Sequence, residues 1–531
     1  RSEDFRGTVN YNTSINNDHI ISLFGGVERN STVRQKAWFR GWGYKYNDGG
    51  IPRYDYRVFK QGNEENTDYF SNVTTTYNRL AFFAMGTYNY AGRYTITGTG
   101  RYEGTNRLGK SRQSRWLPTW NVAGAWNAHE EEFFKNLQPA FSHATLRASY
   151  SLTADAGPGD VTNARAIYLN SNIWRPNNES AESAIYIANL ENSELTYEKK
   201  HEFNVGVSLG FLNNRINFDA DVYSRKNFDL IGLQRTEGAG GEIAKMANVA
   251  SMNTHGYEFT LSTRNIVTKD FTWTTDFIFA NAKTKITKLD TQTRVIDLVS
   301  GSGYALQGYP VRALFSIPFV GLNDEGLPMF INENNEVVTT DINFQEFEKK
   351  GYLKYEGPTD PTITGSFGNN FSYKGFHLNV FMTYSFGNVV RLDPIFKSAY
   401  SDLSSMPKEF KNRWMNPGDE RYTTVPVIAS MRQYKNDSNL SYAYNAYNYS
   451  TERIAKGDFI RLKEISLSYD FPSKWLSAIK FTNLQLKIQA TNLCLLYADK
   501  KLNGQDPEFF NTGGVATPLP KQFTLTVRLG F

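Results

Sequence analysis

The last nine residues of the chain read Phe523-Thr524-Leu525-Thr526-Val527-Arg528-Leu529-Gly530-Phe531. Because successive side chains of a β-strand point to opposite faces, this alternation predicts a strand with one apolar face and one polar face. A strand of this kind that finishes on an aromatic residue is typical of the closing strand of an outer-membrane β-barrel, and we expect its apolar side chains to form the signal for the barrel assembly machinery. These side chains are Phe523, Leu525, Val527, Leu529 and Phe531.

The composition fits an all-β barrel in a lipid bilayer. The chain has 531 residues with a mean hydropathy of −0.50, and no apolar run approaches the roughly 20 residues that a membrane-spanning helix needs. Aromatic residues make up 15% of the chain, which suits the two aromatic girdles of a barrel. The net charge of +5 comes from 58 basic and 53 acidic residues without runs, so we expect no nucleic acid partner.

Alternation and turn signals together predict fifteen antiparallel strands. The clearest pair covers 203–211 and 216–223, joined by the tight turn Leu212-Asn213-Asn214. At 460–470 the alternation changes phase after Lys463-Glu464, which predicts a β-bulge. The predicted strands are 6–15, 19–29, 75–90, 93–104, 116–127, 145–153, 201–211, 215–225, 255–265, 271–283, 363–374, 375–388, 459–471, 483–494 and 522–531.

The connections between these strands alternate in length. An outer-membrane barrel has short periplasmic turns and long extracellular loops, whereas a soluble sandwich has no reason to sort its loops by side. The stretch 128–144 is longer than its place in this series predicts. The short connections include 16–18, 90–92, 213–214 and 374–375. The long ones include 30–74, 154–200, 284–362, 389–458 and 495–521.

The number of strands suggests a part of a larger barrel. Bacterial single-chain barrels have an even number of strands, so fifteen implies a missing portion. If the last strand runs towards the periplasm, the first strand of an odd set runs the same way, which places residue 1 on the extracellular side. The chain opens with Arg1-Ser2-Glu3-Asp4 and no signal peptide, which we interpret as processing or as an incomplete sequence.

Several motifs together carry a family resemblance. The stretch 459–472 reads FIRLKEISLSYDFP, and Arg413-Trp414 is followed by Pro417-Gly418-Asp419-Glu420. From about residue 75 to the end, the motifs and their order resemble the SusC/RagA family of TonB-dependent outer-membrane transporters of the Bacteroidota. The other matching segments are Leu195-Thr196-Tyr197-Glu198, 211–216, Tyr373-Lys374-Gly375-Phe376, 489–493 with Asp506-Pro507-Glu508, and 518–531.

The resemblance implies a barrel of about 22 strands closed by an N-terminal plug. Residues 1–531 would then be the C-terminal portion of one barrel domain, with the plug, about seven strands and the TonB-contacting region absent from this chain. The family implies a SusD-like surface lipoprotein as a lid, a dimer of transporter-lipoprotein pairs, and a place in the outer membrane of a Gram-negative bacterium. It also implies import of oligosaccharides or oligopeptides with TonB-derived energy, without enzymatic activity.

Aromatic side chains in the loops are the candidates for ligand contact, because aromatic faces among hydrogen-bonding groups can hold a bulky polar solute. The segment 433–449 is rich in Tyr, Asn and Ser, a composition that also suits packing within the loop or contact with a partner protein. The candidates are Trp174, Trp414, Tyr434, Tyr442, Tyr444, Tyr447 and Tyr449.

Evidence for metal or catalytic chemistry in the sequence is weak. Asp324 and Glu325 offer oxygen ligands for a structural calcium ion without the spacing of an EF-hand, and calcium is the one cofactor that we consider. Asp219 and Asp221 face the same side of one strand, which fits the water-filled interior of a barrel better than acid-base catalysis. Cys494, the only cysteine, lies in an apolar stretch and excludes an intrachain disulfide. The histidines show no metal-ligand spacing.

Two further functions stay open at this point. A passive porin would have the same strand pattern, and a plug domain in the intact gene would exclude it. A transporter-like barrel could also serve as a structural or assembly scaffold for other envelope proteins. Stable association with envelope machinery and an empty interior would favour the scaffold over the importer.

Overall fold

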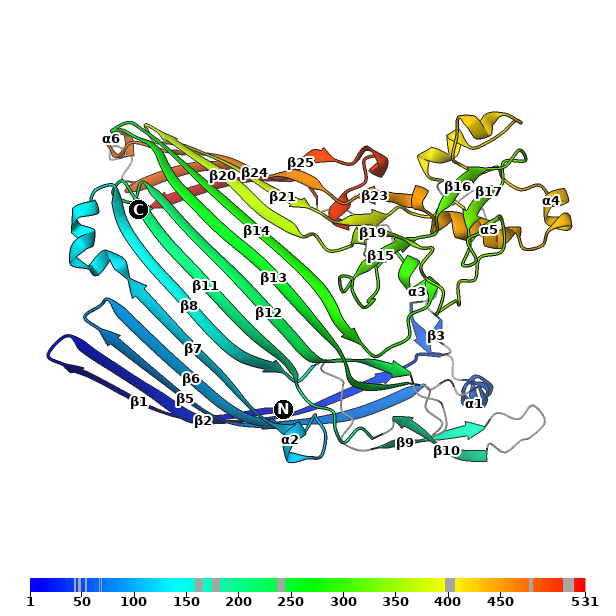
Figure 1. Ribbon diagram of the computed structural model, residues 1–531, viewed down its shortest axis with the longest axis horizontal. Helices are drawn as coiled ribbons and strands as arrows, with labels where there is room; N and C mark the ends of the chain where they lie inside the picture. Colours follow the sequence, from blue (N-terminus) through cyan, green and yellow to red (C-terminus); the bar gives the residue numbers. More distant parts are fainter. Residues whose placement is uncertain are drawn as a thin grey trace.

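The computed structural model contains one antiparallel sheet of fifteen strands, as the sequence predicts (Figure 1). Every long strand pairs with the next long strand along the chain. The strands are β1 (Ser2–Ile15), β2 (His19–Phe39), β5 (Phe70–Tyr90), β6 (Tyr94–Thr105), β7 (Trp116–Asn127), β8 (Phe141–Asp155), β11 (Glu198–Phe211), β12 (Ile216–Arg235), β13 (Ala244–Val267), β14 (Phe271–Leu289), β20 (Ile363–Tyr373), β21 (Phe376–Phe386), β24 (Phe459–Asp470), β25 (Asn483–Ala498) and β26 (Gln522–Gly530). The structure describes residues 1–42, 44–45, 49–52, 55–65, 67, 69–157, 166–173, 182–189, 191–235, 244–396, 406–476, 481–509 and 520–530.

The two faces of the sheet differ in chemistry. On β26, Phe523 and Leu525 are 72% and 66% exposed, and they lie opposite Ala490 and Ile488 of β25. The same pairing of apolar side chains continues across the sheet, for example from Val205 to its partners on β8 and β12. Large apolar side chains exposed over a whole face are what a bilayer solvates, so this apolar face is the outside of the barrel. Phe531 lies outside the described residues.

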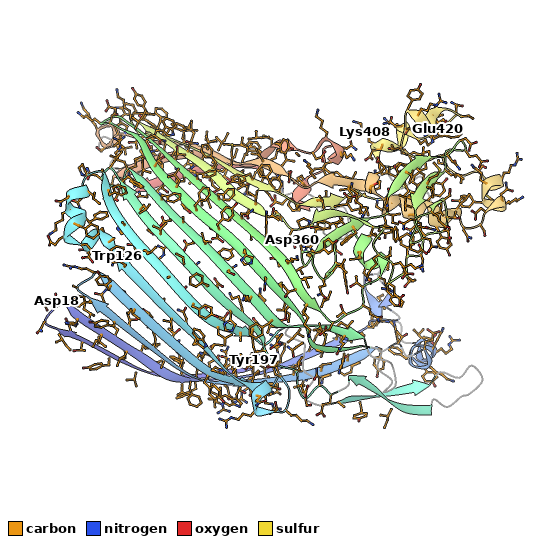
Figure 2. All side chains as sticks on the ribbon, viewed as in Figure 1. Asp18, Trp126, Tyr197, Asp360, Lys408 and Glu420 are labelled. Carbon is orange, nitrogen blue, oxygen red and sulfur yellow. The ribbon has the colours of Figure 1, made fainter. Side chains whose placement is uncertain are left out.

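The short connections gather at one end of the sheet, where Figure 2 shows Asp18 and Trp126. They use residues with positive φ, such as Asn213 and the Lys374-Gly375 pair. Gly375 has φ of +88°, and a Cβ there would lie 2.8 Å from the carbonyl oxygen of Asp470, so glycine is required. The connection between β7 and β8 at this end is longer and contains the 3-10 helices η2 (Ala128–Glu130) and η3 (Glu132–Leu137). The helix α6 (Ser473–Leu476) follows β24.

The predicted β-bulge is present in β24. Phe381 of β21 pairs with Glu464, and the next residue, Met382, pairs with Leu462. Lys463 is therefore the extra residue, and the register with β25 shifts at the same place. Before and after the bulge, the side chains of β24 therefore alternate between the two faces of the sheet in opposite phase. The bulge lies nearer to the loops than to the short turns.

Two long connections, 290–362 and 387–458, fold together at the opposite end of the sheet, and we call them the loop domain (Figure 1). Its core buries side chains from both connections, including Ile317, Phe330, Ile395, Leu440 and Tyr447. No helix among the described residues is long and apolar enough to cross a membrane. The elements of the loop domain are α3 (Val295–Val299), β15 (Ala313–Ser316), β16 (Phe319–Leu322), β17 (Pro328–Ile331), β18 (Val337–Val338), β19 (Lys354–Pro358), β22 (Val389–Arg391), η4 (Lys408–Asn412), η5 (Asp419–Arg421), α4 (Met431–Asn436), α5 (Leu440–Asn448), η6 (Thr451–Arg453) and β23 (Ile454–Lys456).

Smaller elements occupy the remaining long connections. They are β3 (Tyr44–Lys45), β4 (Ile51–Pro52) and α1 (Tyr56–Glu64) between β2 and β5, α2 (Arg112–Arg115) between β6 and β7, β9 (Ile167–Ile173) and β10 (Glu182–Asn189) between β8 and β11, and η8 (Lys500–Leu502) and η9 (Pro507–Phe509) between β25 and β26. Strands and helices thus extend the sheet at the end opposite the short turns (Figure 1).

A buried arginine joins the two connections of the loop domain. The guanidinium of Arg391 donates to the carbonyl oxygen of Phe315 at 2.6 Å, to the hydroxyl of Ser316 at 3.1 Å and to the carbonyl oxygen of Ser450 at 3.1 Å. Its cation also lies 5.7 Å from the centre of the Tyr449 ring. Burial lowers the pKa of Arg391 to about 9, which still leaves the side chain charged at neutral pH.

The apolar face of β26 gives a first prediction. In the full-length protein, Leu525→Arg places a charge against lipid, which costs about 2–4 kcal/mol near the middle of the bilayer, so we expect a large loss of folded barrel. Thr524→Arg lies opposite Gln489 on the polar face and is the matched control. Heat-modifiable migration in SDS gels measures the folded fraction. Equal loss in both variants would show that β26 does not meet lipid as described.

Arg391 gives a second prediction. Arg391→Met leaves the carbonyl groups of Phe315 and Ser450 without their charged donor, at a cost of about 1.5–3 kcal/mol for each hydrogen bond. We expect limited proteolysis of the full-length protein to cut the loop domain at least tenfold faster while the sheet stays intact. Arg421→Met, at an exposed position of the same domain, is the control. Unchanged cleavage of the Arg391→Met protein would refute the joining role.

Candidate functional site

A cleft of about 620 Å³, which we call the mouth cleft, lies between the loop domain and the sheet. Figure 2 shows one of its residues, Asp360, where the sheet meets the loop domain. The ends of β20, β21 and β24 provide one wall, and residues of three long connections provide the rest. The lining residues are Arg312, Thr359, Asp360, Pro361, Thr364, Gly365, Thr383, Tyr384, Ser385, Asn388, Gly457, Phe459, Lys463, Pro507 and Glu508.

The mouth cleft carries charges of both signs. Arg312 Nη1 lies 2.7 Å from Asp360 Oδ1, and the Arg312 Nε also donates to the carbonyl oxygen of Ser302 at 2.9 Å. Lys463, the bulge residue of β24, reaches the same cleft and has no ion pair among the described residues. The cleft therefore offers a solute one free cation beside an exposed ion pair.

Uncharged groups complete the lining. Asn388 is buried, and its Nδ2 donates to the carbonyl oxygen of Thr359 at 3.3 Å, while its Oδ1 has no hydrogen-bond partner among the residues that the structure describes. Phe459 also lines the cleft, and the Arg461 cation lies 5.4 Å from the centre of its ring. The cleft thus combines hydrogen-bonding groups with an aromatic side chain, which is the mixture that holds a polar solute with an apolar surface.

A second buried arginine fixes the segment that closes the cleft on one side. Arg461 of β24 is buried, and its guanidinium donates to both carboxylate oxygens of Asp506, at 2.5 and 2.6 Å. It also lies 3.1 Å from Glu508 Oε2. Charge-assisted bonds of this kind are strong and directional, so Arg461 holds the segment 506–508 against the sheet. Arg461 and the segment that it binds both belong to motifs that carry the family resemblance.

The tyrosines that the sequence suggests for ligand contact lie mostly in the core of the loop domain. Tyr447 is 1% exposed, and the buried Tyr444 donates its hydroxyl to the carbonyl oxygen of Val427 at 2.7 Å. Tyr434 and Tyr449 are partly buried against the same core. Only Tyr442 is largely exposed. None of the five lines the mouth cleft, and ligand contact by these tyrosines stays a prediction.

Trp414 lies inside the loop domain, and ligand contact by it stays a prediction. It is buried, its Nε1 donates to Glu420 Oε2 at 3.0 Å, and its ring lies on Gly326, where a Cβ would be 2.4 Å from the indole. The calcium candidates Asp324 and Glu325 lie in the exposed turn beside Gly326. Among the described residues no three metal-ligating side chains gather, and calcium binding stays untested. Trp174 lies outside the described residues.

The paired aspartates of β12 are on the polar face, as the sequence predicts. Asp221 Oδ2 forms an ion pair with Arg147 Nη2 of β8 at 3.1 Å, and Asp219 Oδ1 accepts a hydrogen bond from Ser208 at 2.5 Å. These contacts make them members of a polar network along the inside of the sheet. The network thus ties β8, β11 and β12 together on the polar face.

The sequence did not predict that the charged residues of the mouth cleft lie together. Arg312 and Asp360 are 48 residues apart, and neither stands in a motif. Lys463 did carry a signal, because a bulge exposes one extra side chain, and bulges often occur beside binding sites. Asp506, Glu508 and Arg461 all stand in sequence motifs, but only the fold shows that Arg461 binds the two carboxylates.

Residues 1–493 match the family model described as TonB dependent receptor-like, beta-barrel. TonB-dependent receptor P39 of Formosa agariphila is 24% identical over 563 residues, which cover 96% of this chain and 50% of that protein. TonB-dependent receptor SusC of Bacteroides thetaiotaomicron is 26% identical over 472 residues, which cover 85% of this chain and 43% of SusC. The chain thus spans about half the length of the curated relatives that it matches.

A solved structure of the RagAB peptide transporter has a similar fold. It superimposes with a TM-score of 0.77 at 22% identity, covering 100% of this chain and 55% of the matched chain. A second RagAB structure, of the peptide importer in a closed-closed state, gives the same TM-score. These matches agree with the SusC/RagA resemblance of the sequence motifs. The chain belongs to the β-barrel family of TonB-dependent receptors, which are outer-membrane proteins, and within that family it is of the SusC/RagA type.

Proposed function

We propose that residues 1–531 are the C-terminal portion of the barrel of an outer-membrane nutrient importer, and that the mouth cleft is the first binding site for its solute. The observation that carries this proposal is the position of the cleft. The cleft lies between the loop domain and the polar face of the sheet. The chain that forms both belongs to the family of TonB-dependent receptors. A solute bound there is already at the entrance of the barrel.

The mechanism begins with capture at the mouth cleft. Lys463, Asp360 and Asn388 hold polar groups of the solute, and the ring of Phe459 covers an apolar part of it. Release into the periplasm then needs energy, which in the family comes through TonB and the N-terminal region of the full-length protein. The chemistry of the cleft accommodates an oligosaccharide or an oligopeptide, since it combines charges of both signs with amide and hydroxyl groups.

The lid for this entrance would be a SusD-like surface lipoprotein, as the family resemblance implies. The loop domain lies at the end of the molecule opposite the short turns (Figure 1). Its large exposed apolar side chains offer the lid a contact surface. A soluble protein rarely leaves so many of them exposed without a partner. These side chains, which are between 48% and 89% exposed, are Met415, Tyr422, Ile428, Met431 and Tyr442.

Uptake tests the mouth cleft. In cells that carry the full-length protein, the double variant Lys463→Gln, Asp360→Asn should lower uptake of the labelled oligosaccharide or oligopeptide that the wild type imports by about tenfold or more, because each charged hydrogen bond contributes about 1.5–3 kcal/mol. Lys408→Gln, an exposed lysine of the loop domain outside the cleft, should leave uptake unchanged. Wild-type uptake by the double variant at equal surface abundance would exclude the cleft as the entry site.

Co-purification tests the lid. Tyr422 is 89% exposed, so Tyr422→Glu should reduce the lipoprotein retained with the affinity-purified full-length transporter by at least fivefold without affecting its folding. Phe133→Glu changes an exposed aromatic residue at the short-turn end and should retain the wild-type amount. Equal retention in the two variants, or a loss in both, would argue against this surface.

A further inference from the structure

Three exposed lysines lie on the apolar face of the sheet, near the end that carries the loop domain. They are Lys226 of β12 and Lys283 and Lys285 of β14, and we call them the lysine patch. Both strands lie inside the sheet, away from its edge strands β1 and β26 (Figure 1). The patch shares no residue with the mouth cleft.

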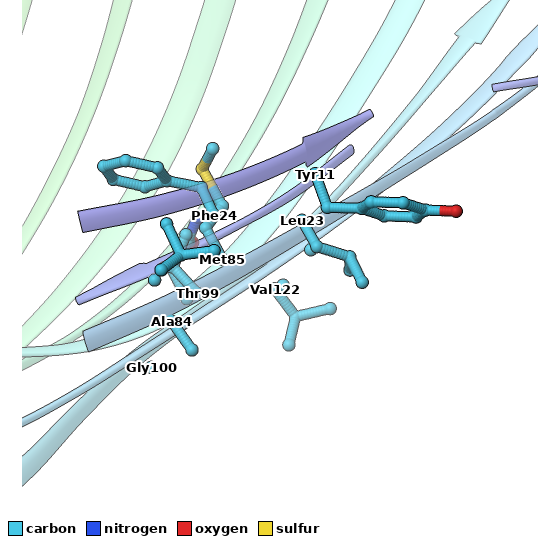
Figure 3. A pocket seen from close by; sticks show the side chains of 13 residues that line it. Tyr11, Leu23, Phe24, Ala84, Met85, Thr99, Gly100 and Val122 are labelled. Carbon is cyan, nitrogen blue, oxygen red and sulfur yellow. The ribbon is translucent and has the colours of Figure 1, made fainter. Parts of the chain in front are cut away.

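The strand register assigns the lysine patch to the face that meets lipid. Figure 3 shows Leu23 and Val122 on one side of the strands and Phe24 and Met85 on the other, and Val122 is 53% exposed on the apolar side. Directly paired residues of neighbouring strands project to the same face, so a row of pairs that begins at Val122 stays on the lipid side. This row consists of Val122, Tyr150, Phe203, Ser224, His255 and Lys283.

The next row towards the loop domain contains the other two lysines. Lys226 pairs with Asn253, and Asn253 pairs with Lys285. Because neighbouring strands are about 4.8 Å apart, the backbones of Lys226 and Lys285 are roughly 10 Å apart, and Lys283 lies one row below on the same strand as Lys285. The flexible four-carbon stems of lysine let ammonium groups at this spacing reach a common ligand.

The lysine patch lies at the extracellular boundary of the bilayer. Lys226 comes ten residues after Ile216, at the short-turn end of β12, and a rise of about 3.4 Å per residue at a tilt of 35–45° gives a height of roughly 24–28 Å. The apolar band of a barrel is about 25 Å tall. Aromatic rings mark the same level: His201 pairs with Lys226, and its ring stacks on Tyr150 and Phe228 with centres 5.6 and 5.5 Å away.

The lysine patch has no counter-charge in the part of the chain that the structure describes. None of its three ammonium groups forms an ion pair there. Two acidic residues farther along the same strands already bind other lysines, Asp229 with Lys199 at 2.7 Å and Asp290 with Lys288 at 2.6 Å. Three cations at the edge of a low-dielectric medium repel one another, and an anion bound among them relieves that repulsion.

Below the lysine patch, the lipid side of the sheet is apolar. Val222 and Tyr257 pair directly with each other and are 60% and 47% exposed, and Phe203 is half exposed beside them. A molecule in the outer leaflet that lies along these strands therefore meets apolar side chains at the level of its acyl chains and cations at the level of its headgroup.

We propose that the lysine patch binds the phosphate group of a lipid in the outer leaflet. The phosphate pairs with the three ammonium groups, Asn253 donates to it from between Lys226 and Lys285, and the acyl chains lie on Phe203 and Val222. Charge complementarity and continuity with the lipid face carry this proposal, since a free phosphate ion makes no use of the apolar surface below. The patch lies outside the path of the solute, so the inference goes beyond the proposed function.

Native mass spectrometry of the purified, delipidated full-length protein tests the proposal with dioleoyl phosphatidate as the probe. We expect saturable binding of phosphatidate. Dioleoylglycerol, which lacks the phosphate, and inorganic phosphate, which lacks the acyl chains, should bind at least tenfold more weakly. Replacing all three residues of the patch by Gln should weaken phosphatidate binding at least tenfold, and replacing them by Arg should preserve it, because Arg keeps the charge.

The matched control is the triple variant Lys408→Gln, Lys411→Gln, Lys435→Gln, which removes the same charge from exposed positions of the loop domain. It should bind phosphatidate like the wild type, and heat-modifiable migration checks that both triple variants are folded. Equal affinity in the Gln variant of the patch and the wild type would overturn the proposal, as would absence of binding to the wild type. Equal binding of dioleoylglycerol or of inorganic phosphate would overturn it as well. Uptake is not measured, so the result does not depend on the importer account.

Discussion

The hydrogen-bonded ladder between antiparallel strands is the constraint on which the rest of this structure depends. A backbone in hydrocarbon has no water to bind its N–H and C=O groups, so each strand must find its partners in the strands beside it. The fifteen strands pair in chain order without crossovers, so each strand between β1 and β26 in this sheet has a partner on both sides. The side-chain period of two then divides the sheet into a lipid face and a polar face.

Buried guanidinium groups hold together the loops, which lie outside the hydrogen-bonded ladder of the sheet. The loops beyond the sheet lack a continuous ladder, and Arg391 and Arg461 instead bind carbonyl or carboxylate oxygens of segments far apart in sequence. A buried charge tolerates little displacement, because losing its partners leaves it desolvated and unpaired. The mouth cleft therefore has one wall from the sheet and another that depends on the Arg461 contact with Asp506.

The sequence predicted the sheet far better than the site. All fifteen strands and the bulge at Lys463 were predictable, because alternation and turn residues are local signals. The burial of the tyrosines of 433–449 was not, since a buried and an exposed tyrosine look alike in sequence. Tyr447 packs against Phe319 and Phe396, which come from different parts of the chain. The ion pair between Arg312 and Asp360 was likewise not predictable, because only the tertiary structure brings the two residues together.

The most direct test of the importer account is native purification of the full-length protein from its outer membrane, followed by mass spectrometry of everything that stays bound. The account predicts a surface lipoprotein in near-equal amount together with a bound oligosaccharide or oligopeptide. Recovery of unrelated envelope proteins around an empty barrel would contradict it and would favour a scaffold. A barrel recovered alone, without lipoprotein or solute, would contradict it as well.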